Sequence, residues 1–346
     1  MKIIFFFKIS YFRNSVYYFY EFCISLTKIY NIFMKDMNAR LMDIVEDENL
    51  SWNKLLVNSK DKFFVRLKED TVCSILENRS MLSSQDIENF KFLKHEIVQI
   101  KKILQEGCGF FIIDGKIFSE FSKKELEYIY SIISQMLGKL YVQNIQNEKF
   151  VLIKDEGKSM KTGGRYHQTK EGGSYHTDSP QWDNVPDFVG LLCINPAKKG
   201  GINKFLSAYS IHNEIKRKSP RFLDELYEKF YFDKRGEYKE NESPTVFQPI
   251  FSYNNNELRF RYLRNYINDG FKIEGKELSD IQIDSLNLID EITKDEDLAL
   301  DYELKSGDMV FFNNHRILHG RTSFEDYEDE NFKRTLIRVW IKNDYM

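Results

Sequence analysis

The hydrophobic pattern divides the chain into a helical first part and a strand-rich second part. From about residue 34 to 105, apolar residues recur every three or four positions, as in "FKFLKHEIVQIKKILQEG", which Gly107 closes. This spacing predicts a helical N-terminal segment over residues 34–105. The stretches that follow, "GFFIIDG", "SKKELEYIYSIISQMLG" and "KFVLIKDEG", predict a buried strand, a helix and a further strand.

Strands dominate the pattern after these elements. Five apolar runs bounded by turn residues predict strands, namely "DFVGLLCINPA", "TVFQPIFSY", "ELRFRYL", "DMVFFNN" and "TLIRVWI". Many strands without a strand–helix repeat favour a fold that is mostly β with helices (α+β), as an antiparallel sandwich or jelly roll. Two helical stretches, "SAYSIHNEIKRK" and "ELSDIQIDSLNLIDEIT", fall at about residues 205–300, which we interpret as a helical excursion that covers the sheet.

Composition and charge narrow the classes of protein. A chain of 346 residues, 42% hydrophobic and 30% charged, can bury a core as one large domain or two small ones. Lys and Arg total 50 and Asp and Glu total 53, so the net charge of −3 offers no broad basic field for a nucleic-acid backbone. We therefore expect no nucleic-acid partner.

The cysteines indicate a reducing environment. Cys23, Cys73, Cys108 and Cys193 lie far apart, with no CxxC spacing among them. This distribution argues against a zinc ribbon and against a disulfide scaffold. We therefore expect a cytoplasmic location.

The first 33 residues are rich in aromatic side chains. Charges interrupt this stretch at Lys2, Lys8, Arg13, Glu21 and Lys28. No uncharged run approaches the ~20 residues of a membrane span, and no cleavage site of a signal peptide follows. Stable membrane insertion and secretion are not expected. The segment 1–33 is either an amphipathic helix on an apolar surface or an extension upstream of the true start near Met34, and we favour the second.

Candidate chemistry begins in the stretch "SYHTDSP". In extended backbone, residues i and i+2 point to the same face, so His176 and Asp178 can present an imidazole and a carboxylate to one ion. Alone, such a pair is weak evidence, because it is common in solvated loops. The stretch "FFNNHRILHGRTSF" supplies His319, with His315 four residues before it. Two histidines and one carboxylate form the facial triad of non-haem Fe(II) oxygenases.

An arginine follows these motifs in the closing strand "RTLIRVWI". Arg334 offers a planar guanidinium, which grips a carboxylate at two points, whereas a lysine offers only a point charge. Arg338 lies four residues further on and, in a strand, faces the same side. The motifs together predict a metal site beside a site for a carboxylate-bearing co-substrate.

At this point the sequence resembles a family, the taurine dioxygenase-like and clavaminate synthase-like oxygenases, which use Fe(II) and 2-oxoglutarate. The resemblance covers roughly residues 105–346. It rests on "YHTDSP", "VGLLCINPAKKGGINKF", "SGDMVFFNNHRILHGRTSF" and "RTLIRVWI", which arrive in the family's order. It implies a double-stranded β-helix (jelly-roll) core in an oxygenase domain over 106–346, with residues 34–105 packed on that core.

The resemblance also implies roles for individual residues. His176, Asp178 and His319 match the residues that bind iron in the family, and His315 matches a variable position. Arg334 matches the arginine that grips the far carboxylate of 2-oxoglutarate.

Further residues and one segment are expected to have roles around the site. Asn203 stands in "GGIN" where relatives carry a threonine that supports the same carboxylate, and an amide can also donate a hydrogen bond. Arg338 matches an arginine that often meets an anionic group on the primary substrate in relatives. We expect Arg261, in "RFRYLRNY", to face the pocket, and we interpret "GGRYHQTKEGG" as a flap. Arg321, in "HGR", either holds the loop of His319 or is a surface charge.

The implied reaction is oxidative decarboxylation of 2-oxoglutarate by O2 to succinate and CO2, coupled to hydroxylation of a small, anionic or amino-acid-like substrate. Relatives also desaturate or close rings. Halogenation is not expected, because halogenating relatives lack the carboxylate that Asp178 supplies.

Two other classes of function stay open. One is a non-redox, metal-binding protein of the cupin kind, such as an isomerase or a small-molecule binding protein. Arg334, at the family's distance after His319, counts against it. The other is an inactive interaction protein on the same scaffold, which the intact site residues disfavour. A homo-oligomer is compatible with the sequence.

Overall fold

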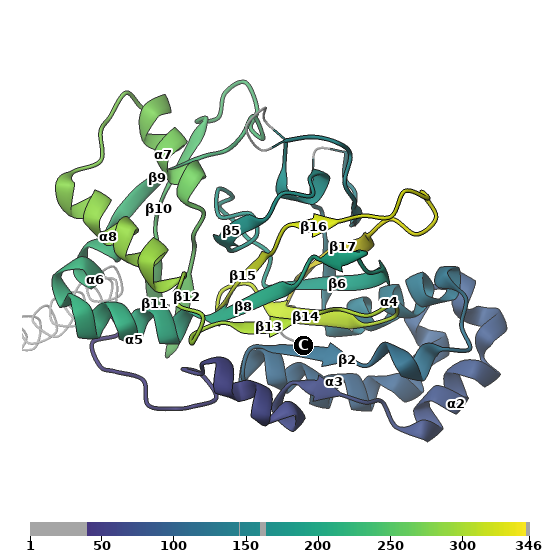
Figure 1. Ribbon diagram of the computed structural model, residues 1–346. Helices are drawn as coiled ribbons and strands as arrows, with labels where there is room; N and C mark the ends of the chain where they lie inside the picture. The colour runs from purple at the N-terminus through teal and green to yellow at the C-terminus, as the bar shows by residue number, and fades with distance from the viewer. Residues whose placement is uncertain (1–39, 145, 160–163, 344–346) are drawn as a thin grey trace, which may run out of the picture.

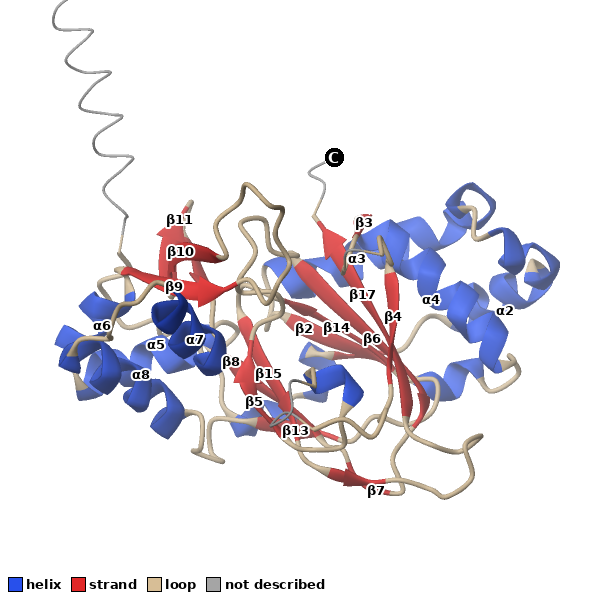
Figure 2. Ribbon diagram, turned by 90° about the horizontal axis from the view of Figure 1, so that it is seen from above, coloured by secondary structure: helices blue, strands red, loops and turns tan. Residues whose placement is uncertain are grey.

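The computed structural model of the protein describes residues 40–144, 146–159 and 164–343. The predicted extension, residues 1–33, lies outside the described residues. Two sheets face each other at the centre of the molecule, with N-terminal helices on one side and the excursion on the other (Figures 1 and 2). This arrangement confirms the expected fold class, a jelly-roll core with helices.

The larger sheet has the strand order β1-β2-β14-β6-β17-β3, with β4 also paired to β17. Its strands are β1 (Phe64–Val65), β2 (Phe110–Ile113), β3 (Lys139–Tyr141), β4 (Phe150–Ile153), β6 (Phe188–Asn195), β14 (Met309–Asn313) and β17 (Thr335–Lys342). The smaller sheet has the order β13-β8-β15-β5. Its strands are β5 (Gly173–His176), β8 (Asn203–Ser207), β13 (Leu300–Tyr302) and β15 (Ile317–Arg321). A short pair, β7 (Lys199–Gly200) with β16 (Phe324–Glu325), stands apart.

The central strands of the larger sheet are buried on both faces, which explains their continuous apolar runs. In β6, Val189 packs into the core between the two sheets, whereas Leu192 packs into the core beneath the helices. In β17, Leu336 packs into the core between the two sheets, and Ile337 packs into the core beneath the helices. Because side chains alternate along a strand, Arg338 lies on the same face as Leu336, toward the smaller sheet.

The N-terminal part is mainly helical, as the spacing predicts. Its elements are 3-10 turns η1 (Lys54–Asn58), η2 (Lys60–Lys62), η3 (Arg79–Ser84), η4 (Ile87–Phe90) and η5 (Gly115–Phe118), with helices α2 (Glu69–Glu77), α3 (Lys91–Gln105) and α4 (Lys123–Leu137). Helix α4 begins at a capping box of Ser122 and Glu125. One short strand also lies within this part: β1 pairs in parallel with β2. Two residues are too few for an alternating pattern to show.

The excursion builds its own hydrophobic core from helices and two hairpins. Its elements are α5 (Ala208–Lys218), α6 (Pro220–Leu226), β9 (Lys229–Asp233), β10 (Thr245–Pro249), β11 (Phe251–Asn254), β12 (Glu257–Phe260), α7 (Arg264–Ile273) and α8 (Asp280–Ile292). The run "TVFQPIFSY" is therefore two strands rather than one, since β10 pairs with β9 and β11 with β12. Asn255 and Asn256, with φ of 53° and 62°, form the tight turn between β11 and β12.

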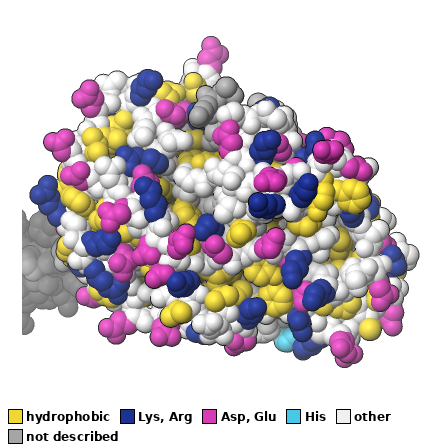
Figure 3. Space-filling view, in the orientation of Figure 1, with side chains coloured by type: hydrophobic (Ala, Val, Ile, Leu, Met, Phe, Trp, Pro, Cys, Tyr) yellow, Lys and Arg dark blue, Asp and Glu magenta, His cyan; other side chains and the backbone are white. Residues whose placement is uncertain are grey.

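The surface carries charges of both signs. On the face that Figure 3 shows, acidic and basic side chains are interspersed, which agrees with the net charge of −3. Within the described residues, no helix is long and apolar enough to cross a bilayer.

Candidate metal centre

The two strands β5 and β15 bring the three predicted metal ligands together. His176 and His319 are direct partners in the antiparallel register of these strands, and their ring centroids lie 4.3 Å apart. Asp178 follows β5 closely, and its Oδ1 lies 3.6 Å from His176 Nε2 and 3.5 Å from His319 Nε2. The candidate ligand atoms all lie within 4.8 Å of one another. One ion can therefore be reached by all three side chains.

The backbone and carboxylate of Asp178 are held by separate partners. Asn314 Oδ1 accepts from the Asp178 N–H at 2.7 Å, and Asn314 Nδ2 donates to the Asp178 carbonyl at 2.9 Å. The indole of Trp340 donates to Asp178 Oδ2 at 2.6 Å, and Arg338 Nη1 lies 3.3 Å from the same oxygen. Oδ2 is thus engaged, while Oδ1 faces the two histidines.

The electrostatics of the site favour an ionised Asp178 and a neutral His319. Burial raises the pKa of Asp178, but the charge of Arg338 and the two nearby histidines outweigh it, so the pKa lies well below its usual value. Burial and the neighbouring His176 lower the pKa of His319 to about 4. These are the protonation states in which the side chains bind a metal.

His176 is oriented by its neighbours. Its Nδ1–H donates to the carbonyl of Ser174 at 3.0 Å, which leaves the Nε2 lone pair directed toward the site. The Tyr166 ring stacks on the imidazole, with centroids 5.1 Å apart and planes 11° apart. Two imidazole nitrogens and one carboxylate oxygen on one side of a site match the facial set that Fe(II) takes in non-haem oxygenases.

A cavity of about 70 Å³ beside the triad contains the predicted carboxylate-binding residues. Arg334 and Asn203 both line it, and their exposed fractions are 3% and 6%. Arg334 Nη1 and Asn203 Nδ2 have no hydrogen-bond partner within the described part of the chain. Arg321, at the end of β15, lines the same cavity and also has a buried Nη1 without a partner. Unsatisfied buried donors are costly, so this arrangement favours an anionic ligand.

Arg338 lines the same cavity as Arg334, in agreement with their expected placement on one face of β17. Its Nε donates to Gln143 Oε1 at 2.7 Å, and Gln143 in turn donates to the carbonyl of Arg338 at 2.9 Å. The guanidinium thus stands between Gln143 and the carboxylate of Asp178. A contact of Arg338 with the primary substrate stays a prediction.

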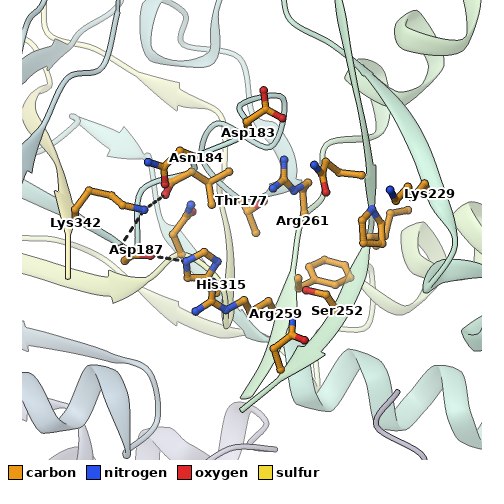
Figure 4. Close-up of a pocket in the computed structure, with 17 residues that line it drawn as sticks. Thr177, Asp183, Asn184, Asp187, Lys229, Ser252, Arg259, Arg261, His315 and Lys342 are labelled. Carbon is orange, nitrogen blue, oxygen red and sulfur yellow. Dashed lines mark hydrogen bonds and ion pairs between the residues drawn. The ribbon is translucent and has the colours of Figure 1, made fainter. Parts of the chain in front are cut away.

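A second cavity, of about 350 Å³, contains two residues that the sequence placed near the site, Arg261 and His315 (Figure 4). Arg261 Nη1 donates to the carbonyls of Pro180 and Trp182, both at 2.7 Å. His315 Nε2 lies 2.8 Å from Asp187 Oδ1, away from the triad. Neither residue lines the cavity of the triad, so Arg261 supports the loop after the His-x-Asp motif.

Sequence reasoning did not single out Trp340, Asn314, Tyr166 or Gln143. For Trp340 a signal exists, because it lies two residues after Arg338 and therefore shares its face of the strand. The other three come from a loop, a 3-10 turn (η7, Tyr166–Gln168) and an irregular segment, where no periodicity indicates direction.

Comparisons with known proteins agree with this geometry. The family described as "Taurine catabolism dioxygenase TauD, TfdA family" matches residues 82–340. FR-33289 synthase from Streptomyces rubellomurinus is 27% identical over 304 residues, which cover 84% of this chain and 88% of that protein. The taurine hydroxylase-like protein SAT17 from Stachybotrys chartarum is 23% identical over 321 residues, which cover 86% of this chain and 80% of that protein.

Solved structures share the fold at low sequence identity. Asparagine oxygenase in complex with Fe(II), 2S,3S-3-hydroxyasparagine and succinate has a TM-score of 0.62 and 12% identity, covering 81% of this chain and 94% of that chain. The non-heme iron oxygenase OrfP in complex with Fe and α-ketoglutaric acid has a TM-score of 0.59 and 13% identity, with the same coverage of 81% and 94%. Because the family match spans most of the sequence, the chain belongs to the TauD/TfdA family of dioxygenases.

Proposed function

We propose that this protein is an Fe(II)- and 2-oxoglutarate-dependent dioxygenase that hydroxylates a small substrate. The observation that carries the proposal is a single cavity in which a His-Asp-His triad adjoins buried nitrogen donors that have no partner among residues 40–144, 146–159 and 164–343. Two imidazoles and one carboxylate are a donor set that fits Fe(II). Asparagine oxygenase and OrfP, which share the fold, were solved with Fe(II) and succinate and with Fe and α-ketoglutaric acid.

Each part of the cavity has a separate task in this proposal. His176, Asp178 and His319 hold the metal from one side and leave its other side open. Arg334 binds the far carboxylate of 2-oxoglutarate, with Asn203 as a further donor. When bound, Fe(II) and 2-oxoglutarate supply the activation of O2 and the decarboxylation that gives succinate and CO2. The protein supplies binding, orientation and exclusion of water.

We propose further that the substrate is small and anionic or amino-acid-like. Arg338 supports this class, because its guanidinium lines the cavity beside the carboxylate of Asp178. A structural neighbour supports the amino-acid class, because a structure of OrfP contains (3S)-hydroxy-L-Arg. Uridine-5'-phosphate dioxygenase from Streptomyces, 24% identical over 183 residues covering 49% of this chain and 66% of that protein, is named for a phosphate-bearing compound. Hydroxylation is the expected outcome.

We also infer a cytoplasmic enzyme that acts on a free small molecule rather than on nucleic acid. Cys73, Cys108 and Cys193 are free thiols, which suits a reducing compartment. The net charge of −3 gives no basic field for a phosphate backbone. A non-redox cupin-like isomerase or binding protein is the alternative, and it would use the triad without consuming O2.

The test is a screen of amino acids and small anions for stimulation of O2 uptake and succinate formation by the Fe(II)-loaded protein. We expect at least one compound to raise both rates in equal molar amounts, and Asp178→Ala to abolish the effect. Metal binding without any consumption of 2-oxoglutarate, even slow and uncoupled, would favour the alternative.

A further inference from the structure

Arg321 connects the candidate co-substrate cavity to the segment that precedes β5. Its Nη2 donates to the carbonyl of Thr169 at 3.1 Å and to the carbonyl of Glu171 at 2.7 Å. Its Nη1 is buried, lines the cavity of the triad and has no hydrogen-bond partner within the described residues. One planar guanidinium therefore contacts both the cavity of the triad and the backbone of the segment before β5.

Arg321 and Arg334 are two like charges that contact the same aromatic ring. Both guanidinium carbons lie over the ring of Phe324, at 4.6 Å and 5.1 Å from its centroid. Both guanidinium groups keep their charge at neutral pH. A carboxylate in the cavity would satisfy both free Nη1 atoms and relieve the repulsion.

The segment held by Arg321, residues 164–173, carries a side chain that touches the metal site. Tyr166 stacks on His176, and its hydroxyl bonds to the Ser174 hydroxyl at 2.8 Å. Gly173 makes this stacking feasible, because a Cβ there would lie 2.1 Å from the Tyr166 ring. The position of the segment thus determines how His176 is covered.

We propose that Arg321 is a second binding residue for the far carboxylate of 2-oxoglutarate, and that this contact couples binding of the co-substrate to the ordering of residues 164–173. The inference rests on the proposed function and deepens it. A carboxylate on Nη1 fixes the plane of the guanidinium, and the same plane presents Nη2 to the carbonyls of Thr169 and Glu171. The carboxylate would thus add a contact on Nη1 to the two that Nη2 makes with the segment.

The experiment compares wild type with Arg321→Gln, both loaded with Fe(II) under anaerobic conditions. The charge-transfer band of the 2-oxoglutarate chelate measures its affinity, and hydrogen exchange measures the protection of the amides of residues 164–173. In wild type, we expect 2-oxoglutarate to slow exchange in this segment by roughly tenfold. In Arg321→Gln, the apparent Kd for 2-oxoglutarate should rise roughly tenfold or more, because a charge-assisted contact is lost. The protection at saturating 2-oxoglutarate should also disappear.

Arg316→Gln is the matched control. Arg316 is a buried arginine that also donates to backbone carbonyls, with Nη1 to Leu104 at 3.4 Å and Gln105 at 2.7 Å, and Nη2 to Gly107 at 2.6 Å. It does not line the cavity of the triad, so this variant should lose stability but keep the affinity and the protection. If Arg321→Gln does not fold, Arg321→Lys keeps the charge and removes the two-sided grip, and the same two losses are expected.

The outcomes separate this inference from the proposed function. A wild-type protein that loads iron but shows no band with 2-oxoglutarate would contradict the proposed function itself. A wild type that binds 2-oxoglutarate while the Arg321 variants bind it equally well would overturn the inference alone. Weakened binding with intact protection of residues 164–173, or lost protection with intact binding, would overturn the coupling.

Discussion

Trp340 and Asp178 are joined by a buried hydrogen bond, in which the indole Nε1–H donates to carboxylate Oδ2 at 2.6 Å. Trp340 is 5% exposed and Asp178 4%, so water does not compete for this bond. Because Oδ2 is engaged, Oδ1 is left to face the two histidines. The bond therefore selects which carboxylate oxygen is offered to a metal.

Replacing Trp340 by phenylalanine keeps most of the ring volume but removes the donor. We expect the affinity for Fe(II) to fall roughly 10- to 100-fold, the range seen when the partner of a metal ligand is lost. Competition against a chromogenic chelator measures the change. Trp182→Phe is the control, since Trp182 packs against Trp340 at 5.2 Å but donates its own N–H to Glu237. Equal losses in both variants would point to packing rather than to the bond.

The two histidines of "NNHRILHGR" should behave differently on removal. His319→Ala should lose bound iron, because it removes one of the three ligands that converge on the site. His315→Ala should keep a full equivalent of iron and lose stability instead, since it breaks a buried contact with Asp187. Metal content after gel filtration and a thermal unfolding curve distinguish the two effects. Iron lost from His315→Ala and kept by His319→Ala would show that His315, rather than His319, is the metal ligand.

The triad was predictable because its signal is chemical and local. A His-x-Asp pair in extended backbone fixes two side chains on one face, and the apolar run before His319 indicates a neighbouring strand. The direct register of His176 with His319 could not be read from the sequence, because strand pairing depends on tertiary contacts.

The residues around the triad were harder to predict for physical reasons. Asn314 holds both backbone groups of Asp178 from a loop, and the conformation of a loop is not encoded by periodicity. The alternation in "RFRYLRNY" predicts a pocket-facing Arg261, and the side chain lines the cavity of about 350 Å³ rather than that of the triad. Its hydrogen bonds to the carbonyls of Pro180 and Trp182 are tertiary contacts, which a sequence pattern cannot show. The two-residue strand β1 is too short for any pattern.

Stability should decrease in mild acid because of His212. This side chain is fully buried in α5, and burial lowers its pKa to about 4. The unfolded chain binds a proton near pH 6.5, whereas the folded chain does not, so stability is full above that pH and falls as the pH drops toward about 4. The loss is on the order of 3 kcal/mol, at 1.36 kcal/mol for each pH unit. Urea unfolding at pH 7.5 and 4.5 measures it.

His212→Gln should reduce this acid sensitivity, because glutamine does not titrate and can still donate to the carbonyl of Leu41, which His212 Nε2 now contacts at 3.2 Å. His95→Gln, at an exposed position of α3, is the control and should leave the pH dependence as in wild type. An unchanged difference between pH 7.5 and 4.5 in His212→Gln would show that other groups cause the acid sensitivity.

Arg334 and Arg338 should separate co-substrate binding from substrate handling. Arg334 is 3% exposed, and its Nη1 has no partner in the part of the chain that the structure describes, so Arg334→Lys removes a two-point grip on the far carboxylate of 2-oxoglutarate. The loss is about 1.5–3 kcal/mol, and the apparent affinity should fall roughly tenfold or more. Arg338→Lys should leave this affinity nearly unchanged and instead raise the substrate requirement or uncouple succinate from product. Anaerobic titration of 2-oxoglutarate into both Fe(II)-loaded variants decides the matter: equal weakening, or weakening only in Arg338→Lys, refutes this division.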